Sequence, residues 1–207
     1  MFAMLTALMQ NNINFTSIPV YKDVRLKSAS GEVINAVVSR LNPKDGQDRR
    51  AIEEIKKSWS KDTAFDIFCR DFLDSKNTCE YYAIELKDGS SLGEKIVGLA
   101  QIIQFRLVSI KTKSNSGLKG AGENLLGRMF ERIAGNGYSN LTFASINNGF
   151  YSHVFGTEHA NMFLGGDYMA EICNYYSLEK QYIIFKSGVD KFINYLKGKY
   201  GGEFHEK

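Results

Sequence analysis

The stretch that most constrains this chain is a glycine-rich turn between a predicted strand and a predicted amphipathic helix. Residues 107–113 (Leu-Val-Ser-Ile-Lys-Thr-Lys) have the composition of a strand. After the turn at 117–122, apolar residues recur at helical spacing, namely Leu125, Leu126, Met129, Phe130 and Ile133. Such a turn gathers unpaired peptide N–H groups at the positive end of a helix dipole, which suits a phosphate or pyrophosphate. Glycines before a helix are also common in ordinary turns.

Two familiar phosphate-binding motifs are excluded. A Walker loop has Lys-Ser or Lys-Thr after its last glycine, whereas Glu123 follows Gly122 here. The dinucleotide-binding fingerprint is incomplete, and no clear acidic residue ends a second strand further on.

The turn, together with the strand before it, resembles the acetyl-CoA signature of the GNAT family of N-acetyltransferases. That signature has a strand of the form L-x-x-L-x-V, a short polar link, Q/R-x-x-G-x-G/A and a helix opening toward L-L. It aligns here without a gap. Ile110 and Thr112 take the last two strand positions, and Gly120 and Gly122 take the glycine positions. Gly117 stands at the Gln/Arg position, which departs from the family pattern.

The resemblance implies acetyl-CoA as the co-substrate, held largely by backbone N–H groups. Ile110 and Thr112 would hold the pantetheine arm and the acetyl oxygen. The pyrophosphate would bind the turn residues Leu118, Lys119, Gly120, Ala121 and Gly122. Asn147, at the end of the next predicted strand, would contact the cofactor arm. No metal is expected, because the three histidines and three cysteines show no metal-ligand spacing.

Acetyl transfer to an amine needs a polarised carbonyl, a neutral amine and a proton for the leaving thiolate. The tyrosine that supplies this proton in the resembling family would fall at Phe163, which has no proton to donate. Tyr151 and Tyr168 are the alternative acids. Glu80 and Glu85, on a predicted strand, are the candidate bases, and a water chain with no single base fits the sequence equally well.

The order of elements predicts a mixed α+β (α/β) fold, with a mostly antiparallel central sheet flanked by helices. The predicted strands are 33–41, 80–86, 95–105, 107–112, 140–146, 168–176 and 180–186. Asn42 and Pro43 are expected to begin the first helix, as its capping residue and its first helical residue. Further helices are expected over 64–73, from the glycine turn to Gly135, and around 189–196. Because a helix joins them, the strands at 107–112 and 140–146 should form one central parallel pair.

One domain is the expected organisation. An acyltransferase-like core over 33–187 would follow an N-terminal extension, 1–32, built of a short helix and a hairpin arm. Residues 188–207 would form a C-terminal helix and a loose tail. The apolar stretch 2–9 is too short to span a membrane and lacks the basic start of a signal peptide. The sequence leaves open whether this extension builds a homodimer.

Composition narrows the possible classes of function and the cellular setting. A net charge of +3, with 43% hydrophobic and 24% charged residues, is typical of a soluble globular protein and does not support nucleic-acid binding. Three widely spaced cysteines indicate a reducing, cytoplasmic (intracellular) setting. The expected partner is an acceptor amine on a small molecule or a protein.

Three functional hypotheses remain open. The first is an acetyl-CoA-dependent N-acetyltransferase that works by direct attack of an amine whose identity the sequence does not reveal. The second is a catalytically inactive GNAT-like protein that binds CoA or serves a regulatory or interaction role. The third is an unrelated α/β protein in which the glycine turn is only a turn. The first two predict CoA binding, and only the first predicts turnover.

Overall fold

The computed structural model describes residues 18–76, 78–87, 95–104, 106–137, 140–145, 169–173 and 180–202. The strands are β1 (Ile18–Ser28), β2 (Val33–Leu41), β3 (Glu80–Leu86), β4 (Ile96–Ile103), β5 (Arg106–Thr112), β6 (Leu118–Lys119), β7 (Asn140–Ser145), β8 (Met169–Cys173) and β9 (Lys180–Phe185). The helices are α1 (Gly46–Ser58), α2 (Thr63–Leu73), α4 (Ala121–Gly135) and α7 (Lys186–Tyr200). The strands form one sheet in the order β6-β1-β2-β3-β4-β5-β7-β9-β8.

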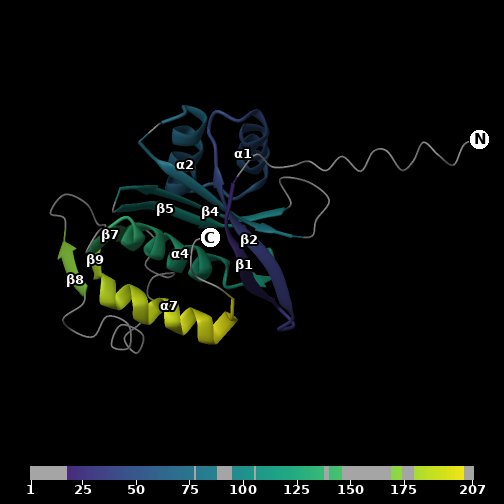
Figure 1. The fold of residues 1–207 in the computed structure, drawn as a ribbon. Coiled ribbons are helices and arrows are strands. Elements are labelled where there is room, and N and C mark those ends of the chain that lie inside the picture. Colours follow the sequence, from purple (N-terminus) through teal and green to yellow (C-terminus); the bar gives the residue numbers. More distant parts are fainter. Residues whose placement is uncertain are drawn as a thin grey trace, which may run out of the picture.

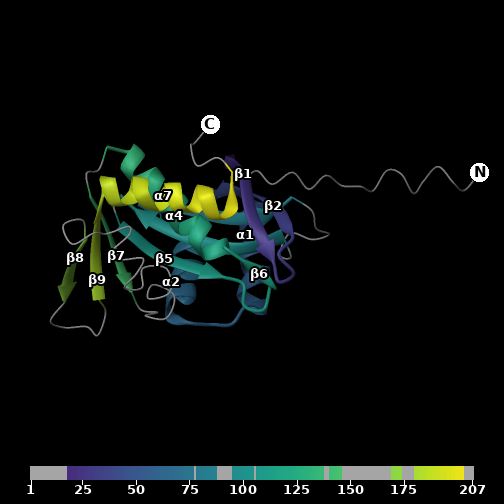
Figure 2. The same ribbon diagram turned by 90° about the horizontal axis from the view of Figure 1, so that it is seen from below.

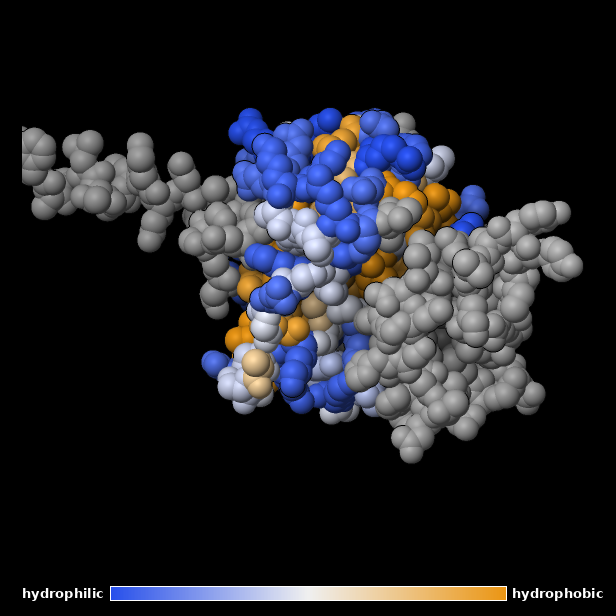
Figure 3. Space-filling model, turned by 180° about the vertical axis from the view of Figure 1, so that it is seen from behind, coloured by the Kyte–Doolittle hydropathy of each residue, from blue (hydrophilic) through white to orange (hydrophobic). Residues whose placement is uncertain are grey.

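The sheet separates two layers of helices. Helices α1 and α2 cover one face, and α4 and α7 cover the other, as two perpendicular views show (Figures 1 and 2). Successive strand residues point to opposite faces, so each strand contributes to both sides. On β3, Tyr82 and Ile84 join the cluster under α4 and α7, while Tyr81 and Ala83 join the cluster under α1 and α2. From behind, hydrophilic side chains gather over α1 and α2, with an apolar patch below them (Figure 3).

The predicted fold class is confirmed. Among the described strands, β5 and β7 form a parallel pair, and the other pairings of the sheet are antiparallel. Helix α4 is the crossover between β5 and β7, as the sequence predicts, and it ends at Gly135. Its buried side includes the residues expected from the helical spacing, Leu125, Leu126, Met129, Phe130 and Ile133.

The start of α1 differs from the prediction. The helix begins at Gly46, and the cap is Asp45, whose side chain accepts the peptide N–H groups two and three residues further on at 2.8 and 3.1 Å. Asn42 instead closes a turn by accepting the N–H of Lys44 at 3.0 Å. Pro43 therefore belongs to the turn that precedes the helix. The interpretation of Asn42 as the cap was wrong, because a second capping residue lies three positions later.

Strand β1 belongs to the sheet from end to end. It pairs with β2 in antiparallel register, and its buried residues join the cluster beneath α4 and α7; they are Val20, Tyr21, Val24 and Leu26. The predicted boundary between residues 32 and 33 thus falls at the turn between two paired strands. The predicted short helix over 2–9 lies outside the described residues, and the division of the chain into three parts stays a prediction.

Asp48, in the first turn of α1, gives the stability of the fold an expected dependence on pH. Its side chain is fully buried. Oδ2 accepts the N–H of Asn42 at 2.8 Å, and Oδ1 has no hydrogen-bond donor among the described residues. Burial raises the pKa of Asp48 from 3.8 to about 6. The folded state therefore binds this proton more tightly than the unfolded state, so the contribution of Asp48 to stability is greatest below about pH 4 and is lost as the pH rises through about 6.

We expect Asp48→Asn to remove this dependence, which amounts to at most about 3 kcal/mol between pH 4 and 7. Urea unfolding at a series of pH values measures it. Asp190→Asn, at an exposed position of α7, is the control and should leave the pH dependence unchanged. Identical pH profiles for wild type and Asp48→Asn would contradict this assignment.

Candidate functional site

The central parallel pair, β5 and β7, is short. Its register covers Arg106 with Thr142 and Leu107 with Phe143. Strand β5 then continues to Thr112 with β4 as its antiparallel partner. Beyond Leu107, the β7-facing edge of β5 therefore has no strand partner within the described part of the chain.

A β-bulge marks the point where the parallel pairing ends. In the pairing of β4 with β5, Gln101 lies opposite Ser109, whereas the next residue, Ile102, lies opposite Leu107. Val108 is thus the extra residue on β5. A bulge bends its strand and increases its twist, and bulges often re-aim side chains beside functional sites. The bulge gives a physical reason for β5 to part from β7 there.

The direction of the peptide groups on β5 follows from one hydrogen bond. The N–H of Lys113 donates to the carbonyl of Val97, in register with the β4–β5 ladder, at 3.0 Å. Residues alternate in such a ladder between those that face the partner strand and those that face away. Ile110 and Thr112 therefore direct their N–H and C=O groups away from β4, toward the side of β7. These are the two strand residues that the family resemblance assigns to the cofactor arm.

The glycine turn leads directly into α4, and α7 covers it from one side. Gly120 is the N-cap of α4, with φ of 92°, a conformation that strongly favours glycine. A Cβ at Gly120 would lie 2.5 Å from the ring of Tyr200, the last residue of α7. Local packing alone therefore requires glycine at this position, with or without a ligand.

The first turn of α4 also carries a buried carboxylate. Glu123 accepts hydrogen bonds from Lys199 Nζ at 2.9 and 3.1 Å and from the Tyr200 hydroxyl at 2.7 Å. Burial alone would lower the pKa of Lys199, but the hydrogen bond and charge of Glu123 outweigh burial and raise it. Ala121, Gly122 and Glu123 are all buried. One negative group of the chain itself thus lies where the helix dipole favours an anion.

The outer side of the turn is basic. Lys119 is exposed on β6 and is the cross-strand partner of Lys27 on β1. Lys27 Nζ lies 5.8 Å from the centre of the Tyr200 ring. The N–H of Leu118 donates to the hydroxyl of Ser116 at 3.3 Å, so a ligand at this N–H would compete with a long internal hydrogen bond. Two lysines are therefore placed to attract phosphate at the mouth of the turn.

Of the predicted catalytic groups, the structure describes the two glutamates. Glu85 is 5% exposed. It follows Ile84 on β3, which pairs with Gly98 on β4, and Gly98 in turn pairs with Thr112 on β5. Glu85 therefore lies two strands from β5, at the same end of the sheet as Thr112. Glu80 lies toward the other end of β3, with Arg132 Nε at 3.4 Å. Tyr151, Tyr168, Phe163 and Asn147 lie outside the described residues.

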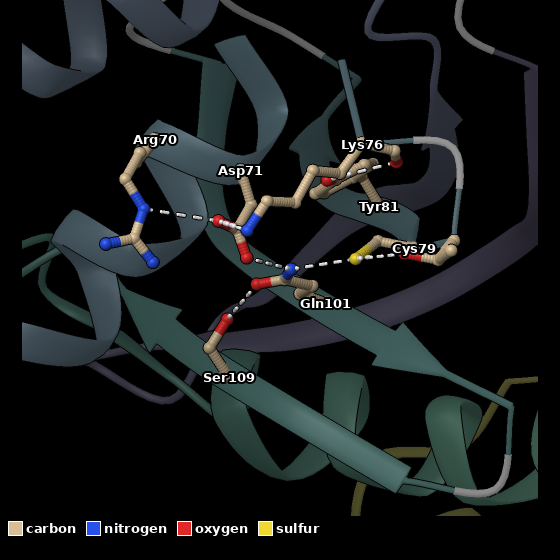
Figure 4. A network of polar contacts seen from close by, with 8 residues as sticks. Arg70, Asp71, Lys76, Cys79, Tyr81, Gln101 and Ser109 are labelled. Carbon is tan, nitrogen blue, oxygen red and sulfur yellow. Dashed lines mark hydrogen bonds and ion pairs between the residues drawn. The ribbon is translucent and has the colours of Figure 1, made fainter. Parts of the chain in front are cut away.

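A buried polar network that the sequence analysis did not single out joins α2 to β5 (Figure 4). Asp71, on α2, is 6% exposed, with Lys76 Nζ at 2.7 Å and Arg70 Nε at 3.3 Å. Burial alone would raise the pKa of Asp71, but hydrogen bonds from Lys76, Gln101 and Arg70 outweigh it and hold the pKa below 3.8. The network continues through Gln101 to Ser109, beside the bulge. Its signal in the sequence is a lone glutamine inside the apolar run of β4.

No group of three or more His, Cys, Asp or Glu side chains is placed to hold a metal ion in the described part of the chain. None of the helices that the structure describes is long and apolar enough to cross a membrane.

Comparison with known proteins finds similarity among solved structures. No protein family and no curated protein matches the sequence. A variant of spermidine N-acetyltransferase from Vibrio cholerae is 14% identical, with a TM-score of 0.46 over 77% of this chain and 97% of that one. An IAA acetyltransferase from Bacillus cereus is 12% identical, with a TM-score of 0.43 over 73% of this chain and 99% of that one.

A GNAT-family acetyltransferase from Staphylococcus aureus is 12% identical, with a TM-score of 0.41 over 72% of this chain and 98% of that one. The solved structures that were found to be similar thus include a protein of the family that the sequence resembles. At this level of similarity these proteins say nothing about the substrate of this chain.

Proposed function

We propose that this protein is an acetyl-CoA-dependent N-acetyltransferase that transfers the acetyl group by direct attack of an amine. The observation that carries the proposal is the edge of β5 beyond the bulge. There the peptide groups of Ile110 and Thr112 face the side of β7, where the strand pairing has ended. Main-chain N–H groups on such an edge suit the amide groups of a pantetheine arm. The edge leads directly to the glycine turn and its two lysines, which suit the phosphates at the other end of CoA.

In this proposal each group of the chain has one task. Acetyl-CoA supplies an activated thioester. The N–H of Ile110 polarises the carbonyl, and Thr112 orients the arm. In the transfer a C–N bond forms, the C–S bond breaks, the amine loses one proton and the sulfur gains one. We propose Glu85, acting through water, as the group that receives the amine proton, and Tyr151 or Tyr168 as the group that protonates the thiolate.

The second candidate function is a CoA-binding regulatory protein without turnover. Glu123 and Tyr200 favour it, because an internal carboxylate and a packed ring already occupy part of the first turn of α4. Phosphate groups would then have to bind on the outer, lysine-lined side of the turn. Thiol release separates the two candidates, because only a transferase frees CoA from acetyl-CoA in the presence of an amine.

Titration calorimetry with acetyl-CoA tests the site itself. We expect micromolar binding by the wild type and a loss of about tenfold or more in Lys119→Glu, because charge reversal removes a favourable contact with phosphate and adds repulsion. Lys57→Glu is the matched control, since it makes the same change of charge at an exposed position on α1. Equal affinities of the two variants for acetyl-CoA would mean that the glycine turn is not part of the binding site. No binding by folded wild type would overturn both candidate functions.

Turnover is measured by the release of CoA thiol with a panel of amines: a small polyamine, an amino-acid amide and a short peptide. Release that depends on one amine class establishes the transferase and identifies the acceptor class. Binding of acetyl-CoA without release by any class would favour the regulatory alternative. We propose a cytoplasmic setting and leave the homodimer to a measurement of mass in solution.

A further inference from the structure

Gln101 lies at the centre of the buried network and makes hydrogen bonds to three of its members (Figure 4). Its Nε2 donates to Asp71 Oδ2 at 3.1 Å and to Cys79 Sγ at 3.2 Å. Its Oε1 accepts the hydroxyl hydrogen of Ser109 at 3.3 Å. Gln101 is fully buried, and Ser109 is 6% exposed. Both amide hydrogens and the amide oxygen of Gln101 are thus engaged.

The charge of Asp71 fixes the donor and the acceptor in these hydrogen bonds. An ionised carboxylate can only accept hydrogen bonds, so it selects the NH₂ end of Gln101, and the amide oxygen must face Ser109. A serine hydroxyl has one hydrogen, which Ser109 gives to Gln101. The oxygen of Ser109 keeps its lone pairs and can act only as an acceptor toward any further group. The network therefore delivers a hydrogen-bond acceptor of defined direction to β5.

The position of this acceptor matters because of its neighbours. Ser109 directly follows the bulge residue Val108, and its peptide bond supplies the N–H of Ile110 that faces the side of β7. On the opposite face of the sheet, Leu107 and Ile110 pack into the apolar cluster with α4, which closes that approach. The Ser109 side chain lies on the face of α2, because it reaches Asp71 through Gln101. A ligand that lies along this edge of β5 therefore meets Ser109 on the face of α2, where 6% of the residue is exposed.

We propose that Ser109 Oγ accepts a hydrogen bond from the N–H of the acceptor amine, and that Gln101 and Asp71 are positioning residues that keep it an acceptor. This proposal rests on the proposed function. A hydrogen bond to one N–H orients the amine so that its lone pair faces the thioester carbon. An oxygen that only accepts cannot compete with Ile110 for the thioester carbonyl. The site selects a neutral amine that carries at least one N–H.

Two stable analogues of matched shape test this contact without turnover. S-carboxamidomethyl-CoA carries an NH₂ group just beyond the carbonyl, and S-acetonyl-CoA carries a methyl group in the same place. We expect the wild type to bind the amide about threefold to tenfold more tightly, the effect of one net hydrogen bond. Ser109→Ala should bind the two analogues equally and keep its affinity for acetyl-CoA. Ser109→Thr retains the hydroxyl and should retain the preference.

A positioning role makes a separate prediction for Asp71→Asn. An asparagine can donate as well as accept, so the Gln101 amide is free to invert and Ser109 then becomes a donor. The preference for the amide analogue should shrink although Ser109 is still present. A merely structural role would lower the melting temperature and leave the preference unchanged. Ser114→Ala, at an exposed position after β5, is the control for a lost hydroxyl.

The possible failures are distinguishable. If the wild type binds acetyl-CoA but does not discriminate between the analogues, or if Ser109→Ala keeps the preference, this inference is overturned and the proposed function stands. If the wild type binds neither acetyl-CoA nor either analogue, the proposed function falls and the inference falls with it.

Discussion

Replacing Gly120 with alanine is expected to lower the free energy of unfolding by about 3 kcal/mol. Two causes combine. A residue with a Cβ at φ of 92° meets a steric cost of about 1 to 2 kcal/mol. The new methyl group would also lie 2.5 Å from the Tyr200 ring, and overpacking of this kind costs about 1 to 3 kcal/mol. Because Tyr200 is held by Glu123 and by packing against the sheet, the ring cannot move away freely.

Gly117→Ala is the matched control in the same turn. Gly117 also has a positive φ, 68°, but a Cβ there would meet no atom within 4 Å. It should therefore lose only the backbone contribution, about 1 kcal/mol. Urea unfolding of the two variants measures the difference. If Gly120→Ala costs no more than Gly117→Ala, the ring of Tyr200 does not lie on this glycine as described.

This result also bears on how the glycine motif is tested. A substitution at Gly120 that abolishes CoA binding would not establish a phosphate site, because the same change disturbs the packing of α7 against α4. Lys119, which is exposed, can be changed without that disturbance. The comparison of Lys119→Glu with Lys57→Glu is therefore the sharper experiment.

Truncation of Arg128 to alanine is expected to cost about 3 to 5 kcal/mol, because it leaves two acceptors without their donor and opens a cavity in the core. Arg128 is fully buried on α4. Its Nη1 donates to Asn124 Oδ1 at 2.8 Å, its Nη2 donates to the carbonyl of Asp23 at 3.2 Å, and the guanidinium lies 5.4 Å from the centre of the Tyr21 ring. Burial lowers the pKa of Arg128 to about 10, so it remains charged at neutral pH.

Arg128→Met separates packing from hydrogen bonding. Methionine fills much of the same volume, so this variant should recover part of the stability that alanine loses. Arg50→Ala, at an exposed position on α1, should change stability by no more than about 0.5 kcal/mol. Equal losses for Arg128→Met and Arg128→Ala would assign the whole effect to the polar contacts. A loss for Arg128→Ala no larger than that for Arg50→Ala would contradict the buried position.

Much of the fold could be predicted from local pattern. The apolar spacing of α4 and the strands on either side of it predicted the crossover and hence the parallel pair, because a helical connection leaves little alternative. Strand β1 was seen only as part of an extension, since the partners that bury Val24 and Leu26 include α7, near the other end of the described chain. Strand β6 has only two residues, and its pairing with β1 is a tertiary contact with no periodic signal.

The candidate site was predictable to a smaller extent. Ile110 and Thr112 were named through a family resemblance, but the side that their peptide groups face depends on the β4–β5 register, and a bulge changes that register unpredictably. Gln101 was not predicted as a site residue, although it is the one polar residue between Ile96 and Ile103. Its partner Asp71 gives no signal in the sequence, because a single aspartate on a helix is ordinarily solvated. Only the packing of α2 on the sheet brings the two together.

The residues that bury the two faces of the sheet are all present at different times during synthesis. All buried members of the cluster beneath α1 and α2 lie between Leu41 and Leu99, so this face can close while the ribosome is still making the rest of the chain. The cluster beneath α4 and α7 runs from Val20 to Tyr200, so its apolar strand residues stay unburied until α7 has been synthesised. At a synthesis rate of about 5 to 20 residues per second, the interval between the first strand and α7 is on the order of ten seconds or more. A nascent chain of this protein therefore presents one finished and one unfinished face, and the unfinished one is where a chaperone would be expected to bind.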